Sequence, residues 1–348
     1  MKKSIIIMLT CVMMITLSAC GNINKSEKKD VSTNNKLKIY TIAFAFQSFT
    51  EQIGGKYVDV ESIYPPGADM HSFEPTQKEM VNIAKSDLFI YSNQDMDPVA
   101  KKIAGSINNE HLKLPVAANL KQADLLSNHE HEHDHEHEGH EAHEEHDEHE
   151  GHDHEGHEAH EEHDEHEGHD HEEGSKDPHI WLDPVLNKKM VKAIKDDLVK
   201  KDSRHKAYYE KRYKQLIADL DDINHEMKDI TSNPKRDTVV ISHDSIGYLA
   251  NRYGFKQEGV SGMNNEEPSQ RDLMAIVKRI DDTKQPYVLY EQNISSKVTD
   301  VIQKESNTTP LSFHNMATLS KKEMNDKDIT YQSLMKENIK SLDKALNH

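Results

Sequence analysis

The feature that most restricts the fold is a low-complexity tract in the middle of the chain, at residues 129–173. It contains 22 Asp and Glu residues, 17 of the chain's 25 His residues and no Lys or Arg. The segment 139–155 recurs without change at 156–172, and its largest apolar side chain is Ala. Such a sequence cannot bury a hydrophobic core. We therefore expect a disordered loop here, with the folded parts of the chain before and after it.

The same tract explains the charge of the chain. The formal net charge is -19, but without residues 129–173 there are 43 Lys and Arg against 40 Asp and Glu. The remainder is nearly neutral and has no basic patch with interleaved aromatic residues, so we expect no nucleic-acid partner. A chain of 348 residues is long enough for two domains with cores of their own.

The N-terminus has the pattern of a processing segment. A basic start is followed by an apolar run, Ile5 to Leu17, that is too short for a membrane-spanning helix. Small residues before Cys20 are typical of a bacterial lipobox. This predicts a signal peptide at 1–19 and a lipidated Cys20. The protein would then be anchored on the extracellular face of the cell membrane. The alternative is an ordinary secretion signal that happens to contain a Cys.

Residues 20–36 are polar and predict a flexible tether. The other cysteine, Cys11, lies in the segment to be removed, so the mature chain has no cysteine pair. A metal site would therefore have to use His, Asp or Glu side chains.

Strand and helix patterns alternate along the rest of the chain, which predicts an α/β fold with parallel sheets. We expect a first lobe at 37–202 and a second at 232–348. Strands in the first lobe are predicted at Leu37–Phe46, Tyr57–Tyr64, Asp87–Ser92 and Leu112–Ala118. Thr76 and Glu79 match a capping box at the start of a helix.

Between the lobes, residues 203–231 predict one long helix. Its apolar residues are spaced by four and three positions in turn: Tyr209, Tyr213, Leu216, Leu220, Ile223, Met227 and Ile230. We expect a rigid helix that joins the two lobes of a monomer. A coiled coil for dimerisation is the alternative.

Four histidines outside the tract lie in short loops or at the ends of strands: His71, His179, His243 and His314. His179 lies in Asp177–Pro184, which contains the only Trp and is expected to be extended because prolines flank its centre. In parallel α/β lobes, ligands collect at the carboxyl ends of the strands. Four imidazoles in a cleft between the lobes would suit tetrahedral zinc, whereas manganese would require more oxygen ligands.

The tract itself would add weak zinc sites. Dense imidazoles among carboxylates favour loose, multiple binding of such ions. A spacer that grew by repeat slippage is the alternative. The accessory ligands that we expect are His129, His131, His133, His135, His137, His140 and His143.

Three motifs carry a resemblance to a known family: Ile63–Pro75, Asp177–Pro184 and Ile241–Tyr248. With Tyr290–Asn293 and the His-rich insertion, they make residues 37–348 resemble the AdcA/ZnuA-type zinc receptors, the cluster A-I lipoproteins of bacterial ABC importers. The resemblance implies two α/β lobes joined by a rigid helix.

The resemblance also implies that His71, His179 and His243 are metal ligands. Zinc receptors of this type often carry a carboxylate where this chain has Ala317, so His314 or a water molecule would fill the fourth position. Glu291 is a further ligand candidate or a partner of a ligand.

The function implied is capture of one tightly bound zinc ion and its delivery to an ABC permease. A manganese receptor of the same cluster is one alternative, and a surface metal buffer or adhesin that acts through the tract is another. A zinc hydrolase would need three protein ligands, an activated water and a general base such as Glu291. We expect a binding protein and no enzyme.

Overall fold

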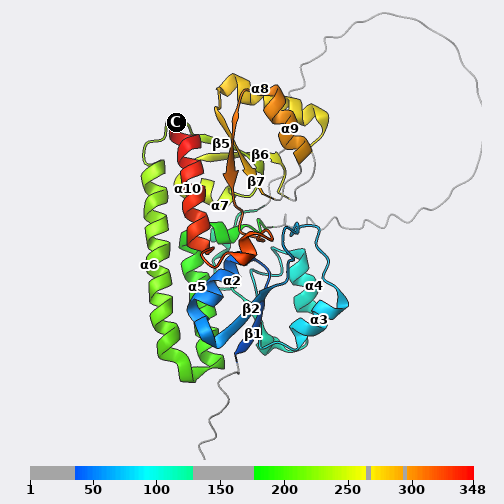
Figure 1. Ribbon diagram of the computed structural model, residues 1–348, viewed down its shortest axis with the longest axis vertical. Coiled ribbons are helices and arrows are strands. Elements are labelled where there is room, and N and C mark those ends of the chain that lie inside the picture. The colour runs from blue at the N-terminus through cyan, green and yellow to red at the C-terminus, as the bar shows by residue number, and fades with distance from the viewer. Residues whose placement is uncertain (1–35, 128–175, 264–267, 293–295) are drawn as a thin grey trace, which may run out of the picture. The chain divides into compact units, whose positions relative to one another are not determined.

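The structure is a computed structural model (Figure 1) that describes residues 36–127, 176–263, 268–292 and 296–348. Within it, Leu37–His348 form one compact unit. The described residues form two parallel four-stranded sheets with helices around them. The predicted α/β class is confirmed.

The first sheet has the strand order β2-β1-β3-β4, and all its neighbouring strands are parallel. Its strands are β1 (Leu37–Thr41), β2 (Val58–Ser62), β3 (Leu88–Tyr91) and β4 (Lys113–Pro115). The helices of this half are α2 (Phe44–Gly54), α3 (Gln77–Ala84), α4 (Pro98–Ser106) and α5 (Pro184–Lys201). We call this half the N-terminal lobe.

The second sheet repeats the arrangement with the order β6-β5-β7-β8, again with parallel neighbours. Its strands are β5 (Thr238–His243), β6 (Lys256–Ser261), β7 (Tyr287–Glu291) and β8 (Thr309–Phe313). Its helices are α7 (Gly247–Tyr253), α8 (Gln270–Thr283) and α9 (Ser296–Glu305). This half is the C-terminal lobe.

A long helix, α6 (Lys206–Thr231), runs beside α5, α2 and the last helix, α10 (Tyr331–Asn347) (Figure 1). The apolar stripe of α6 faces these neighbours, since Leu216, Leu220 and Ile223 are buried. At 1.5 Å per residue its 26 residues span about 39 Å. One hydrophobic cluster extends from the first sheet through α6 to α10.

The first predicted strand was too long at its C-terminal end. The strand ends at Thr41, and α2 begins at Phe44, inside the predicted strand. Among the described residues, no side chain caps α2. Instead, the backbone N–H groups of Phe44 and Ala45 donate to the carbonyls of Ala317 and Met316 at 2.8 and 3.1 Å. Because the groups that cap α2 come from a turn far along the chain, the sequence around residue 44 contains no signal for the start of the helix.

The His179 segment is not extended as expected, because Ile180–Leu182 form a turn of 3-10 helix. Asp183 then caps α5 by accepting the N–H groups of Val185 and Leu186. The predicted capping box of α3 is confirmed, with Thr76 and Glu79 bonded reciprocally.

Candidate metal centre

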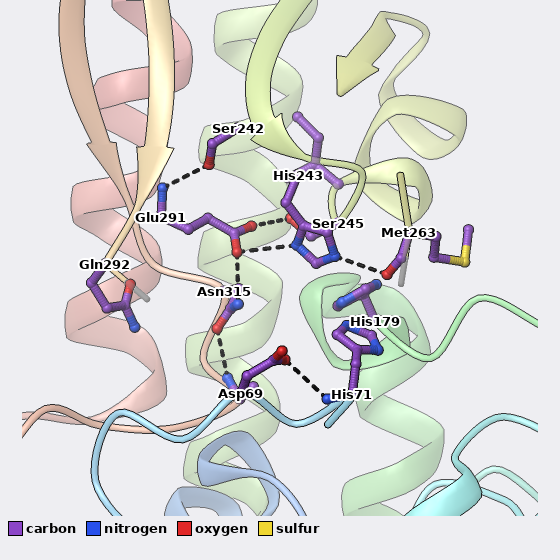
Figure 2. Close-up of polar contacts among 12 residues, drawn as sticks. Asp69, His71, His179, Ser242, His243, Ser245, Met263, Glu291, Gln292 and Asn315 are labelled. Atoms are coloured by element: carbon purple, nitrogen blue, oxygen red, sulfur yellow. Dashed lines mark hydrogen bonds and ion pairs between the residues drawn. The ribbon is translucent and has the colours of Figure 1, made fainter. Parts of the chain in front are cut away.

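His71 lies in the loop after β2. Asp69 Oδ1 accepts the backbone N–H of His71 at 3.0 Å, and Asp69 Oδ2 accepts the hydroxyl of Ser72 at 3.2 Å (Figure 2). These contacts fix the loop while leaving the imidazole free. The Nε2 atom of His71 is buried and has no hydrogen-bond partner among the described residues.

His179 comes immediately before the 3-10 turn and is fully buried. Its ring Nδ1 and its backbone N–H both contact Asp177 Oδ1 at 2.9 Å. This carboxylate favours the tautomer with the proton on Nδ1, so Nε2 keeps its lone pair. That Nε2 atom is also buried, and it has no hydrogen-bond partner in the part of the chain that the structure describes.

His243 is the last residue of β5. Its Nδ1 lies 3.2 Å from Glu291 Oε2, and its Nε2 lies 2.9 Å from the carbonyl oxygen of Met263 (Figure 2). Glu291 ends β7, the strand beside β5, and is only 4% exposed. Glu291 also accepts hydrogen bonds from Ser245 and from Asn315, the latter at 2.7 Å.

The three rings meet at one point. Their ligand nitrogens all lie within 4.8 Å of one another. The ring centroid of His71 is 5.5 Å from that of His179 and 5.4 Å from that of His243. The centroids of His179 and His243 are 4.9 Å apart. Three convergent imidazoles suit a tetrahedral zinc site with one further position.

Burial controls the charge of two of the rings. Burial, followed by repulsion from the neighbouring histidines, lowers the pKa of His71 to about 3. Burial and the charge of His243 lower the pKa of His179 to about 3 as well. Both rings are therefore neutral at pH 7 and can donate a lone pair to a cation. An unpartnered buried nitrogen costs about 1–3 kcal/mol, which a bound metal would offset.

His243 has the opposite electrostatic environment. Burial alone would lower its pKa, but the Glu291 carboxylate raises the pKa of His243 to about 9. Both ring nitrogens face oxygen acceptors, Glu291 and the Met263 carbonyl, which suits the doubly protonated ring. A metal at Nε2 would displace the proton that faces Met263.

The carboxylate beside His179 is also perturbed. Burial raises the pKa of Asp177 to about 7, while the hydrogen bond from the His179 backbone acts in the other direction. A cation on His179 would favour the ionised form of this carboxyl group. Both Asp177 and Glu291 thus match the carboxylate–histidine–metal arrangement that orients ligand rings.

His314, the fourth ligand expected from the sequence, does not lie in this group. Its Nδ1 accepts the N–H of Met316 at 2.9 Å, and its Nε2 faces the amide of Gln292 at 2.9 Å and Glu323 at 3.6 Å. The strand order explains the separation. His314 follows β8, which is two strands away from β5, about 10 Å across the sheet.

The sequence reasoning also missed partners of the ligands. Asp177 and Asp69 each precede a histidine by two residues, and each accepts the backbone N–H of that histidine. The repeated Asp-x-His spacing is an Asx-turn signal that could have revealed both. Asn315 and Met263 approach Glu291 and His243 only through the tertiary fold, and no local pattern marks them.

Several predictions concern residues outside the described part of the chain. They are the signal peptide at 1–19, Cys20, the tether up to residue 35 and the loop at 129–173. The accessory ligands in that loop are included: His129, His131, His133, His135, His137, His140 and His143. In the part that the structure describes, no helix is long and apolar enough to cross a membrane.

Solved structures share the fold of this chain. The metal-dependent lipoprotein YcdH of Bacillus subtilis has a TM-score of 0.66 and 28% identity, with coverage of 89% of this chain and 99% of YcdH. The Zn(II)-bound ZnuA-like domain of Streptococcus pneumoniae AdcA has a TM-score of 0.68 over 90% of this chain and 100% of that domain. At 23% identity, this second likeness shows the fold alone.

Sequence comparisons define the relationship. The high-affinity zinc uptake system protein ZnuA of Bacillus subtilis (strain 168) is 32% identical over 333 residues, or 95% of this chain and 94% of that protein. The zinc-binding lipoprotein AdcA of Streptococcus pneumoniae (strain ATCC BAA-255 / R6) is 26% identical over 98% of this chain, which spans 60% of AdcA. The family model for the zinc-uptake complex component A, periplasmic, matches residues 39–345. The chain belongs to the ZnuA family.

Proposed function

We propose that this protein is an extracytoplasmic receptor that captures Zn²⁺ through His71, His179 and His243 and delivers it to an ABC permease. The observation that carries the proposal is the pair of buried, unpartnered Nε2 atoms on His71 and His179, next to the ring of His243. Membership of the ZnuA family supports delivery to a permease.

The donor set favours zinc over manganese. All three side chains of the described cluster donate nitrogen, and Mn²⁺ sites usually contain carboxylate oxygens. Glu291, a carboxylate that contacts the cluster, already accepts hydrogen bonds from His243, Ser245 and Asn315. In our proposal Glu291 orients His243, and a water molecule takes the fourth position on the metal.

The hydrolase alternative is less well supported by the same contacts. A zinc hydrolase needs a general base beside the metal-bound water. Both oxygens of Glu291 are engaged, Oε1 by Ser245 and Oε2 by His243 and Asn315. We therefore propose that Glu291 orients a ligand and that the site binds its ion without turnover.

We also propose that Cys20 is lipidated and holds the receptor at the outer face of the cell membrane. The relative AdcA is named a lipoprotein, and this chain has small residues before Cys20. The tract at 129–173 would then be an accessory that binds zinc loosely and raises its concentration near the site.

The test separates the site from the tract. Ser127 and Lys176 pair as a β-bridge, and Asp177 N–H donates to Leu126 carbonyl oxygen at 3.0 Å. The ends of the segment 128–175 are therefore adjacent, and a short turn can replace residues 129–173. This variant is titrated with zinc against a chelator of known affinity.

One tight zinc per chain in the deletion variant, lost on His179→Ala, is the expected result. His205→Ala is the matched control, because His205 also bonds an Asp, Asp202, but lies at the junction of α5 and α6. If the deletion removes tight binding, the tract is the binding element. The hypothesis of a metal buffer or adhesin then replaces that of a receptor.

A further inference from the structure

The segment that carries His179 belongs to the N-terminal lobe but is held at both ends by α7 of the C-terminal lobe. The hydroxyl of Tyr248 donates to the carbonyl oxygen of Asp177 at 3.0 Å, and Arg252 Nε donates to the carboxylate of Asp183 at 2.5 Å. Tyr248 and Arg252 are four residues apart and so lie on one face of α7. One helix of the C-terminal lobe therefore fixes the two residues that flank His179.

Asp177 is packed closely against the start of α7. A Cβ atom added to Gly247 would lie 3.0 Å from Asp177 Oδ2, so the carboxylate rests on the glycine. The Tyr248 hydroxyl also accepts the N–H of Leu126 at 3.3 Å, next to Ser127, which forms a β-bridge with Lys176. The orientation of Asp177, and through it that of the His179 ring, therefore depends on a helix in the other lobe.

The orientation of His243, a ligand in the C-terminal lobe, depends in turn on the N-terminal lobe. Its orienting carboxylate, Glu291, is held by the side chain of Asn315 at 2.7 Å (Figure 2). The backbone carbonyl of the same Asn315 accepts the indole N–H of Trp181 at 2.7 Å. Trp181 follows His179 by two residues in the N-terminal lobe. The orientation of a C-terminal ligand thus depends on the position of an N-terminal tryptophan.

The residues after Asn315 strengthen this contact. The carbonyls of Met316 and Ala317 accept the first N–H groups of α2 in the N-terminal lobe. Met316 is fully buried and has a φ of 59°, a backbone conformation that residues other than glycine rarely adopt. The turn at 315–317 is therefore docked on the opposite lobe by its backbone while its first side chain holds Glu291.

We propose that Tyr248 and Asn315 are positioning residues that make retention of the metal depend on contact between the two lobes. Tyr248 bonds the backbone carbonyl of Asp177, the partner of His179, and Asn315 bonds the carboxylate of Glu291, the partner of His243. Each of the two is also tied to the opposite lobe. This inference rests on the proposed function. A partner that parts the lobes would loosen both orienting carboxylates together and release the ion.

The first experiment measures zinc dissociation from the mature chain with Tyr248→Phe. The change removes one hydroxyl, and the dissociation rate should rise about 2- to 12-fold, the range that one neutral hydrogen bond contributes. The association rate should stay the same, because the substitution leaves the three rings in place. Stopped-flow transfer of zinc to a chromophoric chelator measures the dissociation rate, and the tightly bound ion gives the slow phase.

The matched control is Tyr253→Phe on the same helix. The Tyr253 hydroxyl donates to Asn224 of α6 at 3.1 Å, whereas the Tyr248 hydroxyl bonds the backbone of Asp177. It should change the melting temperature of the metal-free chain much as Tyr248→Phe does, yet leave zinc dissociation as in wild type. Equal dissociation rates in the two variants would overturn the proposal.

A double-mutant cycle tests the path of action. In a chain that already carries Asp177→Ala, Tyr248→Phe should change zinc dissociation less than it does in wild type, because its bond to the backbone carbonyl of residue 177 remains while the carboxylate that this bond positions is gone. Likewise, Asn315→Ala should speed dissociation in wild type but not in Glu291→Gln. Full additivity in both cycles would overturn the proposal. A wild type without tight zinc would instead refute the proposed function itself.

Discussion

Replacing Asp177 by Asn should weaken zinc binding without weakening the fold. Asn has the shape of Asp, and its Oδ1 can still accept the two hydrogen bonds from His179. What it lacks is the negative charge that strengthens the lone pair on the opposite ring nitrogen. Loss of such an orienting group typically weakens metal affinity about 10- to 100-fold, or about 1.4–2.7 kcal/mol.

Stability should move the other way. Burial raises the pKa of Asp177 to about 7, so the folded, metal-free chain loses stability as the pH rises from about 4 to about 7. A neutral Asn removes this loss. The metal-free variant should therefore melt at or above the wild-type temperature at pH 7, although it binds zinc less tightly.

The assay pairs zinc competition against a chelator with thermal melting of the metal-free chain. Asp202→Asn is the matched control, because Asp202 is also buried and bonds the Nδ1 of His205, far from the cluster. Its zinc Kd should equal that of wild type. A wild-type Kd in Asp177→Asn, or an equal loss in Asp202→Asn, would show that the orienting role is mistaken.

Three further predictions follow from the same geometry. Glu291→Gln should raise the Kd for zinc about 10- to 100-fold in the chelator assay, since it removes the charged partner of His243. His314→Ala should leave that Kd unchanged, because its ring lies outside the cluster, and a large loss would restore it as a ligand. Zinc binding at pH 7 should release between one and two protons, because His243, whose pKa the Glu291 carboxylate raises to about 9, gives up one, and Asp177, whose pKa burial raises to about 7, is still partly protonated. Calorimetry in two buffers of different ionisation enthalpy measures this release, and a buffer-independent heat would contradict the assignment.

The architecture was predictable because each lobe repeats strand and helix at short spacing. The stripe of α6 and the capping box at Thr76 are local patterns, and both are present in the structure. The start of α2 was misplaced because its cap comes from Met316 and Ala317, more than 270 residues further along the chain. Helix α4 was overlooked, although Asp97 and Pro98 form a start signal that caps it.

The site was predictable to the extent that its ligands follow strands or lie in marked loops. His243 ends a central strand, β5, and therefore reaches the middle of the sheet edge, where the other two rings lie. His314 follows an outer strand, β8, and lies outside the cluster. Sequence alone identifies strand ends but not strand order, so it cannot distinguish a central histidine from a peripheral one.

The difference between local and distant partners also explains how the site can release its ion. Asp177 is two residues from His179, so the local sequence keeps the pair together whether or not the lobes are in contact. Glu291 reaches His243 through the pairing of β7 with β5, which is internal to one lobe. Tyr248, Asn315 and Trp181 connect these pairs across the lobes. Parting the lobes would therefore leave each histidine with its carboxylate but remove the contacts that orient both pairs toward the metal. The ion would lose its ligand geometry, although no ligand segment would unfold.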